Sequence, residues 1–246
     1  MLVDTKYEGS YREGKKHGRG RWKGPKKEAY DGDWVDDLRH GVGIWRTPEG
    51  EEYNGFWKED KKHGRGAWVS EDRWCYKGEW ELNFMHGFGE LIKPTGEVYE
   101  GELAHNKRNG QGLWIGASGH QYNGQWLKNM KHGMGKLSSP SGEVYDGEWF
   151  KDKRHGAGKW SSAADDKYDG QWDNDLQHGH GESRSRFGET YEVNDRFPIS
   201  CTIAFCPYVC VLILCLRETF ANPGVMDVVS TSTVAVTSMR VTGRMT

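Results

Sequence analysis

The sequence predicts an all-β protein, an elongated single-layer antiparallel sheet made of stacked β-hairpins. A 23-residue unit that starts with tyrosine recurs eight times from Tyr7 onward without insertion or deletion. The chain contains 34 Gly and 12 Trp but only 35% hydrophobic residues, too few for a thick aliphatic core. Within each unit, aromatic residues and glycines alternate with polar residues, which is typical of strands. A constant period of this size indicates a repeat array in which each unit contacts its neighbours.

We number positions 1 to 23 within a unit, starting from its tyrosine. Units 1 to 8 begin at Tyr7, Tyr30, Tyr53, Tyr76, Tyr99, Tyr122, Tyr145 and Tyr168, and a partial ninth begins at Tyr191. Positions 3, 12 and 14 are always Gly, and position 5 is aromatic or Leu. Position 11 is His except at Asn109, and position 16 is Trp or Leu except at Ser183.

Each unit should form two strands of five or six residues, a typical strand length. Positions 1, 3 and 5 project from one face because side chains alternate along a strand. In the second strand, Gly18, Gly20 and Trp22 should share one face, with Arg19 and Arg21 on the other. We expect sixteen strands and a candidate seventeenth over 191–195, giving a body about 75 Å long at about 4.8 Å per strand. The strand glycines should leave space for an aromatic ring of a neighbouring strand.

Two kinds of turn should connect the strands. One is the polar segment before each His-Gly pair, such as 58–64. The other contains Pro followed two residues later by Gly, as in 47–50, 93–96 and 139–142, which is a type I or type II turn signal.

The pattern Tyr-x-Gly-x-Trp followed by His-Gly-x-Gly-x-Trp resembles the MORN repeat, and the resemblance covers 7–196. It implies stacked hairpins used for binding and scaffolding, and not for catalysis. By similarity to radial-spoke head components, it also implies a cytoplasmic protein associated with the cytoskeleton or a cilium. We expect no enzymatic activity and no cofactor, because the sequence contains no GxSxG, HExxH or P-loop pattern.

The net charge and the cysteine content argue against two classes of protein, nucleic-acid binders and disulfide-stabilised proteins. The net charge is −2, with 34 basic and 36 acidic residues, so the electrostatic footprint of a nucleic-acid binder is missing. Cys75 is the one cysteine in the repeats, which therefore have no disulfide framework. The sequence starts without a signal-peptide pattern, so we expect a reduced, cytosol-facing array.

The aromatic face is the first candidate binding site. We do not expect a one-layer sheet to bury both faces of its rings, and exposed aromatic grooves mark partner sites. The predicted partner is an elongated protein, with an amphipathic helix lying along the groove. The alternative is that the rings pack only against one another. The predicted face comprises Trp34, Trp57, Trp80, Trp126, Trp149 and Trp172 with Tyr53, Tyr76, Tyr99, Tyr122 and Tyr145.

A basic column at position 10 is the second candidate. It comprises Lys16, Arg39, Lys62, Arg108, Lys131 and Arg154, with Met85 and Gln177 as exceptions. Cations repeated at about 10 Å along one edge would suit anionic lipid headgroups or an acidic partner. The alternative is a solvated turn, partly neutralised by nearby acidic residues such as Asp37 and Asp60.

The histidine column at position 11 does not predict a metal site. Equivalent residues of successive units are two strands apart, about 9.6 Å, whereas zinc ligands converge at about 2 Å from one ion. We expect each His to pack in its turn and to form hydrogen bonds with the neighbouring backbone, and we predict no metal.

The chain divides into a leader (1–6), the repeat array (7–196), an apolar segment (197–218) and a Val/Ser/Thr-rich tail (219–246). Ile199 to Leu216 contains no charge, which makes it a candidate transmembrane helix. The alternative function is therefore a membrane tether or lipid-binding protein whose repeats face the cytosol, an outline that resembles junctophilins. The abrupt change after Phe197 also fits an incorrectly predicted gene end, or a tail that is buried or aggregates.

Overall fold

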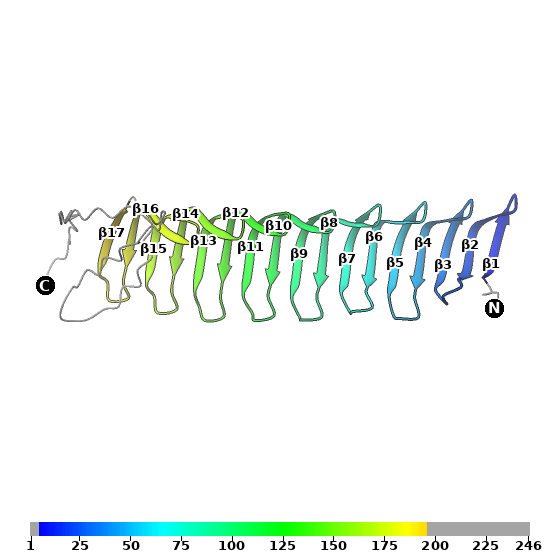
Figure 1. Ribbon diagram of the computed structural model, residues 1–246, viewed down its shortest axis with the longest axis horizontal. Coiled ribbons are helices and arrows are strands. Elements are labelled where there is room, and N and C mark those ends of the chain that lie inside the picture. The colour runs from blue at the N-terminus through cyan, green and yellow to red at the C-terminus, as the bar shows by residue number, and fades with distance from the viewer. Residues whose placement is uncertain (1–4, 196–246) are drawn as a thin grey trace, which may run out of the picture.

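The computed structural model describes residues 5–195, which form one antiparallel sheet of 17 strands, and that range contains no helix. Each strand pairs with its neighbours in sequence, from β1 paired with β2 to β16 paired with β17. Figure 1 shows the sheet as a single elongated layer. The predicted fold class is confirmed.

Each unit contributes two strands of different length. The first strands have seven residues: β1 (Lys6–Arg12), β3 (Ala29–Val35), β5 (Glu52–Lys58), β7 (Cys75–Glu81), β9 (Val98–Ala104), β11 (Gln121–Leu127), β13 (Val144–Phe150) and β15 (Lys167–Asp173). The second strands have nine: β2 (Lys15–Lys23), β4 (Leu38–Arg46), β6 (Lys61–Val69), β8 (Phe84–Ile92), β10 (Lys107–Ile115), β12 (Met130–Ser138), β14 (Lys153–Ser161) and β16 (Leu176–Arg184). The six-residue β17 (Thr190–Asp195) occupies the place of the expected seventeenth strand.

The expected strand length was therefore too short, because the turn within each unit has only two residues. In unit 3 this tip turn is Glu59–Asp60, and both residues have positive φ, 50° and 63°. Two successive positive φ values define a type I′ turn, whose twist suits a hairpin. The His-Gly pair consequently lies inside β6 and not in the turn. Gly64, with φ 59°, lies beside a register shift in the β5–β6 pairing, a bulge that requires this backbone conformation.

The turns between units follow the prediction more closely. At 47–50 the Gly50 amide donates to the Thr47 carbonyl oxygen at 3.2 Å, and the Thr47 amide donates to the Glu51 carbonyl oxygen at 2.9 Å. Gly50 has φ 100°, a conformation that explains why glycine ends this turn.

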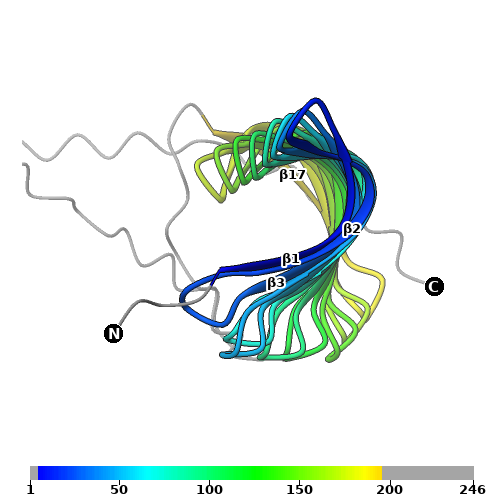
Figure 2. The ribbon, with the colours of Figure 1, turned by 90° about the vertical axis from the view of Figure 1, so that its right-hand side faces the viewer.

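The sheet curls across its strands into a trough, which is visible when it is viewed along its length (Figure 2). The tip turns form one rim and the turns between units form the other. One cavity is lined by Asp37 from the first rim, Thr47 from the second and Trp34 between them, so the aromatic face is concave. We call this face the groove and the opposite one the convex face.

The core of the molecule is the floor of the groove. Its tyrosines at position 1 and rings at position 5 are 0–6% exposed from unit 2 onward. Curvature brings neighbouring columns together, and this buries rings that we expected a single-layer sheet to leave exposed. The buried residues are Tyr30, Trp34, Tyr53, Trp57, Tyr76, Trp80, Tyr99, Leu103, Tyr122, Trp126, Tyr145, Trp149, Tyr168 and Trp172.

Within residues 5–195 no helix has the length and apolar character to cross a membrane. The candidate transmembrane segment, 199–216, lies outside the described residues, as do the whole of the segments assigned to 197–218 and 219–246 and four residues of the leader.

Candidate functional site: the aromatic groove

The floor of the groove is built on tyrosine rings that fill the space left by glycines. A Cβ atom at Gly32 or Gly43 would collide with the ring of Tyr30, and the same holds in the other units. The Tyr30 hydroxyl donates to the carbonyl oxygen of Asp33 at 3.1 Å. Each pair of facing glycines therefore accommodates the tyrosine ring of its own unit. In unit 2, Tyr30 and Gly32 lie on β3, and Gly43 lies on the neighbouring β4.

The position-5 tryptophans join consecutive units. Trp57 packs edge-to-face against Tyr53 of its own unit at 5.0 Å and against Tyr30 of the preceding unit at 5.5 Å between ring centroids. Its Nε1 donates to the Gly43 carbonyl oxygen at 3.1 Å. The equivalent hydrogen bonds are made by Trp34, Trp80, Trp126, Trp149 and Trp172 at 2.8–3.3 Å. The predicted aromatic face is thus mainly a structural element.

The basic column does not lie on a free edge, because its side chains cover these rings from inside the groove. The guanidinium carbon of Arg39 is 4.2 Å from the centroid of Trp57, a cation–π distance. In each pair the cation precedes the ring by 18 residues. The other pairs are Lys16–Trp34, Lys62–Trp80, Arg108–Trp126, Lys131–Trp149 and Arg154–Trp172, at 4.0–5.0 Å.

The residue that breaks the basic column and the residue that breaks the ring column at position 5 belong to the same packing pair. Met85 is the apolar residue in the basic column, and Leu103, 18 residues later, is the aliphatic residue among the buried position-5 side chains. Met85 packs against the buried cluster that contains Leu103. Where the ring is missing, the cation is missing too, which indicates that positions 10 and 5 of successive units form one packing unit.

Asp or Asn at position 8 holds each basic residue from the next tip turn. Oδ1 of Asp60 accepts from the backbone amide of Arg39 at 3.0 Å and from its Nε at 2.9 Å. In return, the Asp60 amide donates to the Arg39 carbonyl oxygen at 3.0 Å. Equivalent acceptors are Asp37, Asn83, Asn106, Asn129, Asp152 and Asp175. Sequence reasoning missed this role, although Asp or Asn fills position 8 in seven of eight units.

Burial shifts the pKa values of the titratable side chains on the floor of the groove. It lowers the pKa values of Lys62 and Lys131, and that of Arg108, because desolvation penalises their charged forms. Glu51, whose Oε1 lies 3.7 Å from Lys62 Nζ, partly offsets the effect on Lys62. Burial also raises the pKa values of the floor tyrosines, including Tyr30 and Tyr53.

The accessible aromatic surface of the groove belongs to the second tryptophan column, at position 16. Each member lies directly across the strand pair from a floor tyrosine, as Trp45 does from Tyr30, and is half-buried. Trp68 Nε1 donates to Glu51 Oε1 at 2.7 Å. Trp114 and Trp160 donate likewise to Glu97 and Glu143. The column comprises Trp22, Trp45, Trp68, Trp114 and Trp160, with Leu91 and Leu137 between them.

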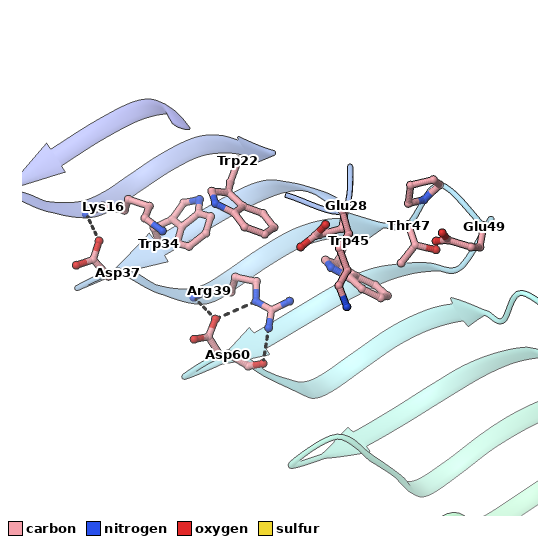
Figure 3. A pocket seen from close by; sticks show the side chains of 12 residues that line it. Lys16, Trp22, Glu28, Trp34, Asp37, Arg39, Trp45, Thr47, Glu49 and Asp60 are labelled. Carbon is pink, nitrogen blue, oxygen red and sulfur yellow. Dashed lines mark hydrogen bonds and ion pairs between the residues drawn. The ribbon is translucent and has the colours of Figure 1, made fainter. Parts of the chain in front are cut away.

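Two consecutive tryptophans of this column, Trp22 and Trp45, line a cavity of about 530 Å³ in units 1 to 3. Figure 3 shows Trp22 and Trp45 beside the cations Lys16 and Arg39, with Asp60 hydrogen-bonded to Arg39. The cavity is open to solvent, and both tryptophan and charged side chains line it. It therefore suits a segment that presents apolar and charged side chains side by side.

The position-11 histidines lie in strands along the tip-turn side. His17 Nδ1 is 3.5 Å from Asp36, and His86 Nδ1 is 3.5 Å from Glu81. The backbone carbonyl oxygen of His40 accepts a hydrogen bond from Tyr30 at 3.4 Å. Within 5–195, no three His, Cys, Asp or Glu side chains are grouped so as to hold a metal ion.

The convex face carries exposed apolar side chains between its charges. Val42 pairs across β4 and β5 with Phe56, and these side chains are 43% and 50% exposed. Phe88 and Met134 are comparably exposed. This face therefore offers a second surface against which the specificity of the groove can be tested.

Comparison with known proteins identifies the repeat. A protein-family model described as MORN repeat matches 7–27, 30–52, 53–73, 76–98, 99–121, 122–144, 145–166 and 168–185. A search of curated proteins finds no match.

Solved structures show weak similarity. The TCP10c domain of Drosophila melanogaster Sas-4 is 10% identical, with a TM-score of 0.37 over 63% of this chain and 93% of that one. The TCP10 domain of Danio rerio CPAP in complex with a STIL peptide is 11% identical, with a TM-score of 0.34 over 73% of this chain and 80% of that one.

Proposed function

The chain belongs to the MORN repeat family, and we propose that it is a non-enzymatic scaffold that holds an elongated protein segment along its groove. The observation that carries this proposal is the row of half-buried position-16 tryptophans, which follows the groove beside the cation column. Tryptophan and arginine are enriched among the residues that dominate binding energy. A helix lying in a groove is an established mode of recognition, and an amphipathic helix is the proposed occupant.

The proposed binding surface differs from the aromatic face expected from the sequence. Trp57, Trp80 and Trp126 are 4–6% exposed and hydrogen-bonded to backbone carbonyl groups, so replacing them would damage the fold. The position-16 column is the better target because the chain itself has Leu in that column at Leu91 and Leu137.

The test is affinity capture from an extract of cells that express the protein, with three baits. These are the natural chain, a groove variant carrying Trp22→Leu, Trp45→Leu and Trp68→Leu, and a convex-face variant carrying Val42→Ser, Phe56→Ser and Phe88→Ser. We expect a captured protein that the groove variant loses and the convex variant retains. Equal capture by all three baits, or loss only with the convex variant, would refute the groove as the binding site.

We further propose that the partner belongs to the cytoskeleton or an axoneme, on the basis of the similarity of this repeat to those of radial-spoke head proteins. Imaging of the tagged full chain and of the groove variant tests this. The natural chain should follow cytoskeletal or ciliary structures and the groove variant should be diffuse, whereas the same diffuse pattern for both would contradict the assignment.

A further inference from the structure

The cations of the groove differ in their ion pairing. Nε of Arg39 lies 2.9 Å from Asp60, and Nε of Arg154 lies 3.3 Å from Asp175. Lys62 Nζ is 3.7 Å from Glu51. Each of these three cations therefore has a carboxylate within ion-pair distance, whereas among the described residues Lys16, at the first unit, has none and Asp37 accepts only from its backbone amide.

Arg108 and Lys131, in the neighbouring units 5 and 6, lack such a partner. Among the described residues, no carboxylate oxygen lies within ion-pair distance of either side chain. Position 8 opposite Arg108 is Asn129, a neutral residue: its Oδ1 accepts from the Arg108 amide, and its backbone carbonyl oxygen accepts from Arg108 Nη2 at 3.0 Å, so neither contact supplies a negative charge. Opposite Lys131, Asp152 likewise accepts from the backbone amide at 2.8 Å.

Both cations are nevertheless half-buried on the floor. Arg108 lies 4.0 Å from the centroid of Trp126, and Lys131 lies 4.4 Å from that of Trp149. Burial lowers the pKa of each, so removal from water is not fully compensated by the protein's own carboxylates. The acids on the opposite side, Glu97 and Glu143, accept from the indoles of Trp114 and Trp160.

We propose that units 5 and 6 bind an acidic protein segment whose two carboxylates, about 10 Å apart, pair with Arg108 and Lys131. The distance follows from the two-strand repeat of the sheet, about 9.6 Å at about 4.8 Å per strand. The inference rests on the proposed function and specifies its partner. In a helix, residues seven apart rise about 10.5 Å and return to nearly the same face, so the fitting helix has Glu or Asp at positions i and i+7.

A flat anionic membrane is a poorer fit to the same charges. Arg108 and Lys131 cover the floor of a trough whose two rims are formed by turns. Headgroups at a bilayer surface would have to enter the trough to reach them, whereas a single segment lies within it. The acidic segment is therefore the occupant that the geometry favours.

The test measures binding of the full chain to labelled synthetic helical peptides of equal length that differ only at the acidic positions. One peptide has Glu at i and i+7, one has Glu at i and i+4 (about 6 Å apart on the same face), and one has Gln in place of both Glu residues. We expect the i,i+7 peptide to bind about tenfold more tightly than the other two, a difference of about 1.4 kcal/mol. Equal affinity for all three peptides, or failure of all three to bind, would overturn the proposal.

Variants of the chain locate the contact. Arg108→Gln with Lys131→Gln should remove the preference for the i,i+7 peptide, and position 10 accepts Gln at Gln177. Arg108→Lys with Lys131→Arg keeps both charges and should preserve the preference. Lys136→Gln, a charge change on an exposed convex-face residue, should leave it unaltered. Loss of the preference with Lys136→Gln, or its survival in the double Gln variant, would contradict the proposal.

Two further measurements separate this proposal from others. Vesicles containing phosphatidylserine should not compete with the i,i+7 peptide, and full displacement would show that the cations prefer a lipid surface. If the peptides show no preference while capture of the natural partner still depends on Trp22, Trp45 and Trp68, the acidic-segment proposal fails and the scaffold function stands. If that capture also shows no dependence, the scaffold function fails as well.

Discussion

At the residue scale, the array depends on side chains that fit against glycine. The Tyr30 ring occupies the space above Gly32 and Gly43, and its hydroxyl is held by the Asp33 carbonyl oxygen. Arg39 then covers the Trp57 ring, which itself donates to the Gly43 carbonyl oxygen. A single unit thus uses a small set of contacts, and each of them is repeated along the chain.

Gly43→Ala should lower the free energy of unfolding by about 1–3 kcal/mol, because the added methyl group collides with the Tyr30 ring and overpacks the floor. Gly14→Asn is the matched control, since Gly14 has φ 77° and open space around it, and Asn fills the same position in other units. Urea titration analysed with a nearest-neighbour repeat model measures both changes. Equal destabilisation by the two substitutions would contradict the packing role.

The pairing of Arg39 with Trp57 should be energetically coupled. A double-mutant cycle with Arg39→Met and Trp57→Leu reproduces the pair that the chain has at Met85 and Leu103. We expect the double variant to be more stable than the sum of the single changes by about 1 kcal/mol, from the lost cation–π contact in each single variant. Strict additivity would show that the two side chains stabilise the sheet independently.

The buried tyrosines should make the protein sensitive to alkali. Burial raises the pKa values of Tyr30, Tyr53, Tyr76, Tyr99, Tyr122, Tyr145 and Tyr168. The folded chain therefore keeps protons that the unfolded chain releases above about pH 10, so stability is unaffected below that pH and falls above it. The lowered pKa values of Lys62 and Lys131 act in the opposite direction, but these residues are outnumbered.

The measurement for this prediction is the urea midpoint from about pH 8 to about pH 11.5, together with the tyrosinate absorbance. We expect the midpoint to fall only above about pH 10 and the absorbance to rise with unfolding. A constant midpoint across this range, with tyrosines ionising in the folded chain, would contradict the burial account.

At the element scale, each hairpin tip docks on the preceding unit. Asp60 uses its side chain and its own amide to bind the backbone of Arg39 in β4. The tip turn therefore joins units as well as reversing the chain. Its positive φ values favour Asp and Asn, the same side chains that supply the acceptor.

Asp60→Ala should destabilise the array by about 1–3 kcal/mol, because the Arg39 amide loses its acceptor and Ala fits positive φ poorly. Asp60→Asn should have a much smaller effect, since Asn83, Asn106 and Asn129 do the same work in other units. Thermal unfolding of the two variants measures the difference. Equal losses would show that the charge of Asp60, and not its hydrogen bond to the backbone, is what matters.

The sequence predicted the strands correctly wherever the alternation of side chains along a strand, a period of two residues, was sufficient to define them. The facing of Tyr, Gly and Trp, the number of strands and the turns between units were all correct. Strand length and the placement of His were wrong, because a two-residue turn with positive φ at residues such as Glu59 and Asp60 has little sequence signal outside Asn-Gly and Asp-Gly. The bulge at Gly64 also extends β6 beyond the simple alternation.

At the scale of the whole molecule, the junction between units 4 and 5 differs from the others. Leu103 cannot donate the hydrogen bond that tryptophan gives to the preceding unit, and Met85 replaces the covering cation. Amides of β8 and β9 should therefore exchange with deuterium faster than those of β4 and β5. Met85→Lys with Leu103→Trp should slow that exchange to the level of the other junctions, and no change on substitution would contradict this account.

The candidate site was only partly predictable. The aromatic column and the basic column were both visible in the sequence. Their contact was not, because a cation of one unit covers a ring of the next unit, and only the curvature of the sheet brings them together. Curvature also decides exposure, since it buries Trp57 while leaving Trp45 half-accessible. The coincidence of Met85 with Leu103 was the available sequence signal for the pairing.

The most direct test of the central proposal, that the groove is the binding face, is covalent footprinting of the chain alone and with its captured partner. Hydroxyl-radical oxidation modifies Trp, Phe and Met side chains according to their exposure. We predict that labelling of Trp22, Trp45 and Trp68 falls in the complex while labelling of Phe56, Phe88 and Met134 is unchanged. Protection of the convex-face residues, with the groove tryptophans labelled as in the free chain, would contradict the proposal.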